Sequence, residues 1–223
     1  MQPFSNPARI AVRKTEEIYP YYAGFSRTFA EDALEWATRG NRERLVLDPW
    51  NGSGTTTRSA SELGMSSIGF DLNPVMVLVA KAELLDPAES TVLLPLARRI
   101  VKTVRKSSIL DNQHPLNVLF DPATSSDIVE LARAIWLHVV ATELPKVPRE
   151  IPLAWEDMAP LAGSYFVALF NSVRGVLAGL ATSNPTWLRV PKSQESRIYV
   201  ERRQIFDAFI PVVAYAVPNN KKF

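Results

Sequence analysis

The sequence predicts an α/β fold in which a short parallel sheet is followed by a mostly helical region. Two observations predict the sheet. The apolar residues 45–47 stop at Asp48-Pro49, and a second short run at residues 66–70 ends at an acid, Asp71. A segment of helical composition joins the two runs, which gives a strand, helix, strand unit. The third observation is the middle of the chain, where the apolar residues have helical spacing.

Composition excludes several classes of protein. The 223 residues are 47% apolar and 22% charged, which is ordinary for a globular domain, and the net charge of +2 does not by itself indicate a polyanionic partner. The absence of cysteine excludes disulfides and thiol chemistry, and with two histidines no zinc site is expected. Neither a signal peptide nor a membrane span of the usual uninterrupted length is evident, so we expect a cytoplasmic protein without membrane contacts.

A glycine-containing loop joins the first expected strand to the following helix. Gly52 and Gly54 let the backbone pass close to a ligand, and the N–H groups at the start of a helix favour a carboxylate or phosphate. An acid after the second strand, here Asp71, can accept hydrogen bonds from both hydroxyls of a ribose. No lysine follows Gly54, and the three-glycine dinucleotide fingerprint is not met. The segment therefore suits another nucleoside-containing cofactor.

The spelling of this segment resembles a known family. DPWNGSGTT followed by GFDLNP resembles the cofactor motif of class I S-adenosylmethionine-dependent methyltransferases, most closely those that methylate amino groups of bases in DNA. Their usual spelling is DPF-x-GSGTT, from which Trp50 departs. Upstream, residues 19–26 (YPYYAGFS) resemble an HPYPAKFS-like segment, with departures at Tyr19, Tyr22 and Gly24. The resemblance implies a Rossmann-like fold, with an incomplete sheet in this chain, and S-adenosylmethionine as cofactor.

The resemblance also assigns cofactor contacts. Asp48, Gly52 and Gly54 would form the floor under the methionine part, the first helical residues would offer donors to its carboxylate, and Asp71 would hold the ribose. The residues after Asp71 would border the adenine, and the aromatic segment would close over the cofactor. The complete set is Tyr22, Phe25, Ser26, Asp48, Pro49, Trp50, Gly52, Gly54, Thr55, Thr56, Asp71, Leu72 and Asn73. Structural alternatives are a plain strand stop at Asp48, a helix cap at Asp71 and packing of the aromatic residues on the sheet edge.

The chain divides into three expected parts. Residues 1–86 hold an N-terminal arm, the aromatic turn and the cofactor-binding unit, residues 87–181 are mainly helical, and residues 182–223 form a basic C-terminal segment. We expect helices at residues 27–38, 75–85, 91–106, 125–142 and 161–180, and a short strand at residues 117–120. Ser125 or Ser126 is expected to cap the fourth of these helices.

Two groups of basic residues are candidates for contacts with DNA phosphates. The first lies within the helix expected at residues 91–106, and the second lies near the C-terminus. The candidates are Arg98, Arg99, Lys102, Arg105, Lys106, Arg202 and Arg203. The alternative is that these side chains belong to an ordinary solvated surface.

The methyltransferases that this chain resembles carry a catalytic loop of the form Asp/Asn/Ser-Pro-Pro-aromatic. Only residues 183–187 (SNPTW) come close, with Thr186 in place of the second proline. In this reading Asn184 and the carbonyl of Pro185 accept hydrogen bonds from the target amino group, and Trp187 stacks on the flipped base. The segment follows an apolar helix rather than a strand, and few residues remain after it, so a structural turn is the alternative.

These observations favour the cofactor-binding portion of a DNA amino-methyltransferase. DNA and a complementary methyltransferase chain or segment that carries the catalytic loop are the expected partners, and no metal is expected. Three alternatives stay open: an RNA methyltransferase that acts on a guanine amino group, a non-catalytic DNA-binding or regulatory module, and an α/β enzyme with another cofactor.

Overall fold

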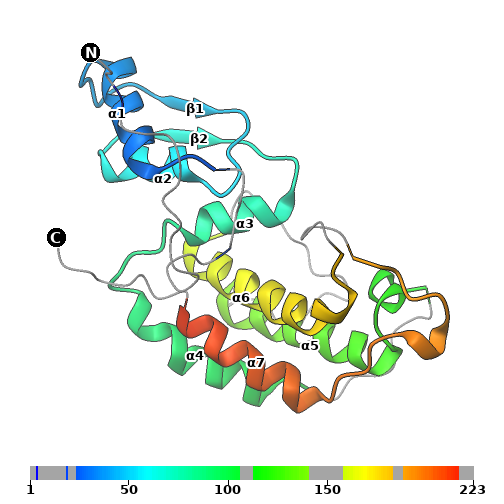
Figure 1. Ribbon diagram of the computed structural model, residues 1–223. Coiled ribbons are helices and arrows are strands. Elements are labelled where there is room, and N and C mark those ends of the chain that lie inside the picture. Colours follow the sequence, from blue (N-terminus) through cyan, green and yellow to red (C-terminus); the bar gives the residue numbers. More distant parts are fainter. Residues whose placement is uncertain are drawn as a thin grey trace. The chain divides into compact units, whose positions relative to one another are not determined.

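A computed structural model describes Phe4, Tyr19 and residues 24–105, 113–140, 158–182 and 188–215. The chain forms two compact units. Unit 1 comprises Met1–Ser90, Leu153–Val167 and Tyr215–Phe223, and unit 2 comprises Thr91–Pro152 and Ala168–Ala214. Figure 1 shows the elements of both units, coloured along the chain from blue to red.

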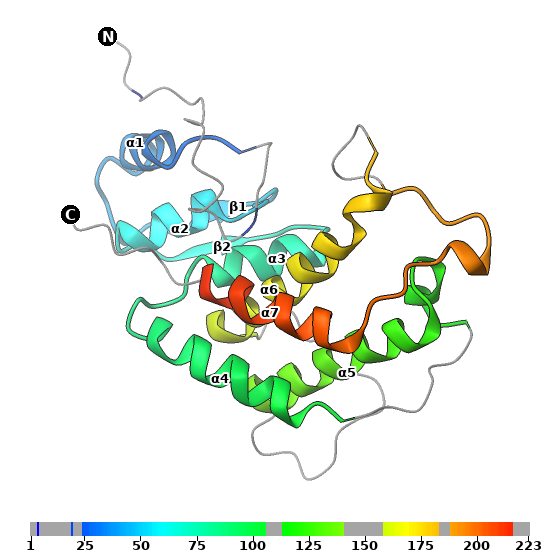
Figure 2. The same cartoon turned by 60° about the horizontal axis from the view of Figure 1, so that its bottom comes forward.

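Unit 1 contains the strand, helix, strand arrangement that the sequence predicts. Strands β1 (Val46–Asp48) and β2 (Ser67–Gly69) pair in parallel, and α2 (Thr55–Glu62) connects them. Helix α1 (Arg27–Thr38) packs on α2, and α3 (Pro74–Ala82) follows β2 (Figures 1 and 2). The described residues thus contain one βαβ unit with two strands.

The core of this βαβ unit is small. Val46 of β1, Ala60 of α2 and Met65 are buried together, and Leu34 and Leu63 pack against them. Because β1 turns Val46 toward α2, its neighbour Leu47 faces the opposite side of the sheet. Helix α2 therefore covers only one face of the sheet.

Unit 2 is helical in its described part. It contains most of α4 (Ser90–Thr103), α5 (Pro122–Val139), the second half of α6 (Pro160–Val176) and all of α7 (Arg202–Tyr215) except its last residue. Short 3-10 helices lie at η1 (Pro115–Val118), η3 (Leu177–Leu180) and η4 (Gln194–Ser196). Apolar side chains of the helices form its core, namely Leu93, Ile100, Leu131, Ile135, Ile205, Phe209 and Val213.

Two expectations for the helical region were wrong in detail, and one helix was not expected. The expected strand at residues 117–120 is mostly the 3-10 helix η1, and only Phe120 forms a bridge, with Ile198. The cap of α5 is Asp121, which accepts hydrogen bonds from the N–H groups of Ala123 (2.8 Å) and Thr124 (3.2 Å), because Asp followed by proline is a strong helix start. Helix α7, which has Pro211 inside it, lies in the segment that was expected only to be basic.

Within the described residues, Pro160–Leu180 is the one helical stretch whose length and composition would allow it to cross a membrane. Just over half of its most apolar window, 56%, is buried inside the protein. A core helix of a globular protein has the same properties, and buried residues such as Tyr165 and Val167 are consistent with that role.

Candidate cofactor-binding site

The glycine loop of unit 1 is tied to the end of β2 by the carboxylate of Asp71. One oxygen, Oδ2, accepts a hydrogen bond from the N–H of Gly52 at 2.9 Å, and the other, Oδ1, accepts one from the N–H of Asn73 at 2.8 Å. The backbone adds a further link, because the N–H of Asn51 donates to the carbonyl of Phe70 at 2.9 Å. The loop and the acid, far apart in sequence, therefore lie side by side.

Gly54 is required at its position for two independent reasons. Its φ of +86° lies in the left-handed region, which disfavours side chains. A Cβ atom on this residue would also lie 2.7 Å from Cβ and 2.8 Å from Cα of Ala80 in α3. The glycine therefore lets the start of α2 lie directly against α3.

Asn51 is a loop residue whose role the sequence analysis missed. Its Oδ1 accepts a hydrogen bond from the hydroxyl of Thr57 at 3.1 Å, and its carbonyl accepts one from the N–H of Gly54 at 2.9 Å. The side chain occupies the space that a Cβ on Gly69 would need, only 2.5 Å away. An asparagine before a glycine in a loop was the available signal, because this residue type bonds nearby backbone.

Helix α2 begins without a side-chain cap among the described residues. Its N-cap is Gly54, which has no side chain, and the helix starts directly with Thr55 and Thr56. The first N–H groups of a helix have no partner inside the helix and carry a partial positive charge. This end of α2 is thus suited to a carboxylate, while Asp71 lies at the other side of the same loop.

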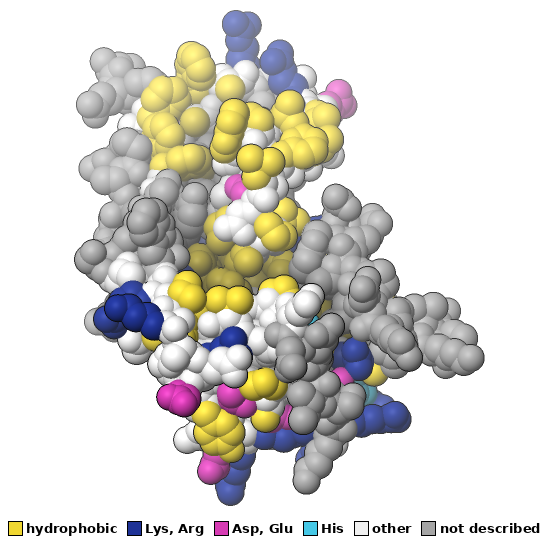
Figure 3. All heavy atoms as spheres, turned by 90° about the vertical axis from the view of Figure 1, so that its right-hand side faces the viewer, with side chains coloured by type: hydrophobic (Ala, Val, Ile, Leu, Met, Phe, Trp, Pro, Cys, Tyr) yellow, Lys and Arg dark blue, Asp and Glu magenta, His cyan; other side chains and the backbone are white. Residues whose placement is uncertain are grey.

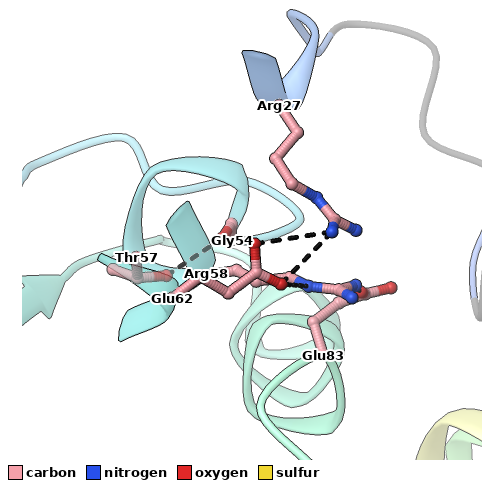
Figure 4. Close-up of polar contacts among 6 residues, drawn as sticks. All are labelled: Arg27, Gly54, Thr57, Arg58, Glu62 and Glu83. Atoms are coloured by element: carbon pink, nitrogen blue, oxygen red, sulfur yellow. Dashed lines mark hydrogen bonds and ion pairs between the residues drawn. The ribbon is translucent and has the colours of Figure 1, made fainter. Parts of the chain in front are cut away.

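An ion-pair network fixes α2 from its outer side (Figure 4). Arg58 of α2 pairs with Glu62 at 3.1 Å and with Glu83, which follows α3, and Arg27 of α1 pairs with Glu62 at 3.2 Å. Glu83 is largely buried, so its pair with Arg58 is better shielded from solvent than the pair of Arg27. The network thus links α2, which starts at the glycine loop, to α1 and to the end of α3.

The residues around the glycine loop fit the polar and aromatic parts of S-adenosylmethionine. An ionised carboxylate offers about four acceptor positions. Asp71 uses two of them for the N–H groups of Gly52 and Asn73, which leaves two for the hydroxyls of a ribose. Beside it, Leu72 is 99% exposed and Trp50 is 82% exposed, so both apolar surfaces are free to contact an aromatic base.

Other predicted cofactor residues have structural contacts of their own. Asp48 Oδ1 accepts a hydrogen bond from the N–H of Trp50 at 3.0 Å across Pro49, which corresponds to the strand-stop alternative. Asn73 caps α3 through the N–H of Val75 at 3.0 Å. These bonds shape the loop ends and do not test the predicted contacts with a cofactor.

The aromatic segment before α1 is described in part. Ser26 caps α1, with its hydroxyl accepting a hydrogen bond from the N–H of Phe29 at 3.2 Å. Phe25 packs edge to face on Phe29 of α1, with ring centroids 5.6 Å apart. Tyr22 lies outside the described residues.

The basic candidates of unit 2 differ in their surroundings. Arg98, Arg99 and Lys102 of α4 and Arg105 beyond it are exposed, as a phosphate contact requires, whereas Lys106 lies outside the described residues. Arg203 is exposed and pairs with Asp207 at 3.4 Å.

Arg202 has a structural role. It donates to Asp127 at 3.1 Å and to the carbonyls of Val104 and Arg105 at 2.7 and 3.0 Å. Burial raises the pKa of Asp127 even though Arg202 opposes the shift. Arg202 therefore connects α5, α7 and the end of α4, and it is half-buried.

His138 of α5 lies beside the end of α4. Its Nε2 is 2.8 Å from the hydroxyl of Thr103, which itself lies 2.8 Å from the carbonyl of Ile100. Since that hydroxyl has one hydrogen and donates it to the carbonyl, Nε2 of His138 carries a proton and donates to Thr103. Burial, followed by the charge of Arg99, lowers the pKa of His138.

The catalytic candidates Asn184, Pro185 and Trp187 lie outside the described residues. In the described part of the chain, no group of three or more histidine, cysteine or acidic side chains is arranged to hold a metal ion.

Comparisons with known proteins concern the N-terminal part of the chain. Residues 9–82 match the model of a family described as DNA methylase. The type II methyltransferase M.MjaII of Methanocaldococcus jannaschii is 36% identical over 67 residues, which are 30% of this chain and 12% of that relative. No solved structure matches the chain. Residues 9–82, which contain the glycine loop and Asp71, are therefore similar to DNA methylases, and the chain spans only a small part of the length of the relative that it matches.

Proposed function

We propose that this chain is the cofactor-binding portion of an S-adenosylmethionine-dependent enzyme that methylates an exocyclic amino group of a base in DNA. The observation that carries the proposal is the loop at residues 51–54, held by Asp71 on one side and leading into the uncapped start of α2 on the other. The family match of residues 9–82 and the methyltransferase name of the relative support it.

Each part of the loop has a proposed task. The start of α2, at Thr55 and Thr56, binds the carboxylate of the cofactor, Gly52 and Gly54 give its methionine part a floor without side chains, and Asp71 holds the ribose. Leu72 and Asn73 border the adenine. The cofactor supplies a methyl group activated on a sulfonium, and these residues bind and orient it, which accounts for much of the rate in a transfer between positioned groups.

Two sources of the catalytic loop are compatible with this function. One is the segment with Asn184, Pro185 and Trp187, and the other is a complementary polypeptide that carries a Pro-Pro-aromatic loop. DNA is the proposed substrate, with the exposed cations Arg98, Arg99 and Lys102 as phosphate contacts. Because DNA is the proposed substrate, we infer a location in the cytoplasm or nucleoid.

Isothermal titration calorimetry of the purified chain with S-adenosylmethionine tests cofactor binding. We expect saturable binding that Asp71→Ala weakens by about 10- to 100-fold, because hydrogen bonds to a charged group contribute roughly 1.5–3 kcal/mol. Asp86→Ala is the matched control, since Asp86 accepts a similar backbone hydrogen bond, from Ala88 at 2.8 Å, in an exposed turn outside the loop. Equal weakening by both substitutions would contradict the assignment of Asp71.

Transfer of a labelled methyl group to DNA and to RNA then tests the substrate. Transfer to DNA by the chain, alone or together with a complementary polypeptide, supports the proposal. Transfer to RNA in its place would favour the alternative of an RNA methyltransferase.

A further inference from the structure

One face of the sheet in unit 1 is apolar and exposed. The register pairs Leu47 with Ile68, so these side chains share a face. Leu45 directly precedes β1 and Phe70 directly follows β2, and each is two positions from one of this pair, so the alternation of side chains places them on the same face. All four are exposed, Leu47 by 62%. We call these four residues the open face. The upper part of Figure 3, which shows unit 1, carries a large group of apolar side chains.

A parallel sheet with such a face is normally covered on both sides. Strands of parallel sheets are apolar on both faces because helices pack against each of them. Here Val46 is buried on the side of α2, whereas no described residue of unit 1 buries the open face to the same extent. Contiguous exposed apolar side chains of this kind mark an interaction surface.

The edge of β1 beside the open face is also available for pairing. In a parallel pair, both backbone polar groups of a residue point to the same neighbouring strand, and those of the next residue point away. The N–H of Val46 donates to Ser66 at 2.9 Å, and the carbonyl of Asp48 accepts from Phe70 at 2.8 Å, so both residues face β2. The backbone groups of Leu47 therefore face away from β2, where no other strand lies among the described residues.

The handedness of crossover connections indicates which kind of segment can cover the open face. The connection from β1 to β2 places α2 on one face of the sheet. A parallel strand added on the other side of β1 with the usual right-handed connection would place its helix on the opposite face, which is the open face. A second copy of this chain fits less well, because a two-fold axis pairs two identical edge strands in antiparallel orientation, and β1 has only three residues.

We propose that the open face and the edge of β1 bind a strand and helix segment from a polypeptide outside these 223 residues. This inference rests on the proposed function and names its partner. Ligands of open α/β sheets bind where crossover connections leave in opposite directions. The added strand would create such a point at the carboxyl end of β1 and bring the loop that follows it beside the glycine loop. The aligned part of M.MjaII is 12% of that protein, which leaves room for such a segment in the relative.

Single cysteines test the proposal, because the chain has no cysteine of its own. Leu47→Cys places a thiol on the open face, and Val190→Cys in unit 2 is a matched control, since both native side chains are 62% exposed. Each variant is purified alone and after coexpression with the polypeptides encoded directly before and after this chain. In a complex, we expect alkylation of the Leu47→Cys thiol by a maleimide to slow at least tenfold and that of Val190→Cys to be unchanged.

Three outcomes of the alkylation experiment would overturn the proposal. They are the absence of a complex with either neighbouring polypeptide, a complex in which both thiols react as fast as before, and self-association of the chain alone that protects the Leu47→Cys thiol. In the isolated chain, neither Leu47→Lys nor Val190→Lys should change the thermal unfolding midpoint. A selective fall for Leu47→Lys would show that the chain covers this face itself, which also overturns the proposal.

Calorimetry on the same samples separates this inference from the proposed function. Binding of S-adenosylmethionine by the chain without a protected Leu47→Cys thiol would overturn only the docking surface. A protected thiol in a complex that does not bind S-adenosylmethionine would overturn the proposed function.

Discussion

The substitution Gly54→Ala should lower the stability of unit 1 and distort its glycine loop. Holding a residue other than glycine in the left-handed region costs roughly 1–2 kcal/mol. The new Cβ would also meet Cβ and Cα of Ala80 at 2.7 and 2.8 Å, so backbone must move, and overpacking of this kind costs about 1–3 kcal/mol. The two effects together predict a loss of about 2–5 kcal/mol in the free energy of unfolding.

Gly64→Ala is the matched control for this prediction. Gly64 also has a left-handed backbone, with a φ of +71°, but nothing lies within 4 Å of the position of its Cβ. It should therefore lose only the first contribution, roughly 1–2 kcal/mol. Urea unfolding monitored by circular dichroism measures both variants. If Gly54→Ala is no more destabilising than Gly64→Ala, the close approach of α2 and α3 at this position is wrong.

The remaining predictions concern single side chains in both units. Asp71→Asn, which keeps one acceptor oxygen, should retain more affinity for S-adenosylmethionine than Asp71→Ala in calorimetry, and equal losses would contradict the loop geometry. Arg202→Ala should lower the free energy of unfolding by about 2–4 kcal/mol because it leaves Asp127 half-buried and unpaired, whereas Arg203→Ala, at a side chain 87% exposed, should change urea unfolding little. His138 has a lowered pKa in the folded protein, so its stabilising effect is complete above its ordinary value of 6.5 and is lost as pH falls through the folded pKa. Urea unfolding of His138→Gln should accordingly depend less on pH between about 7 and 5 than that of the wild type, and an identical dependence would refute this.

The sequence was sufficient for unit 1 because each of its elements has a local chemical signal. Asp48 and Pro49 stop the first strand, Gly64 ends the turn after α2 with a φ of +71°, and Asn73 caps α3 ahead of a proline. Such signals depend on a few neighbouring residues, so they can be identified without knowledge of the tertiary structure. The motif resemblance added a similarity to DNA methylases, which the match of residues 9–82 supports.

The loop contacts required the structure because they join residues distant in sequence. The sequence indicated that Asp71 and the glycine loop act together, but it did not indicate that the carboxylate bonds Gly52 directly. Nor did it indicate that Asn51 fills the space beside Gly69, or that Ala80 makes glycine obligatory at position 54. These are packing relations between elements, and they depend on tertiary geometry.

Helix α7 is an element that local sequence patterns did not reveal. Its basic residues at the start suggested an exposed surface, and no helix was expected in this segment, inside which Pro211 lies. In the structure the apolar residues Ile205, Phe209 and Val213 are buried at helical spacing, and Arg202 is engaged by Asp127. Tertiary burial of this apolar stripe outweighs the local cost of the proline.

Binding of S-adenosylmethionine by the glycine loop of the isolated chain is the property on which the proposed function most directly depends. Nuclear magnetic resonance of the ¹⁵N-labelled chain can follow each backbone amide during titration with that compound. We predict saturable shifts concentrated at Gly52, Thr55, Thr56 and Asn73, with small shifts in α5 and α7. An unchanged spectrum at saturating ligand, or shifts confined to unit 2, would contradict the proposal that the loop and Asp71 form the cofactor site.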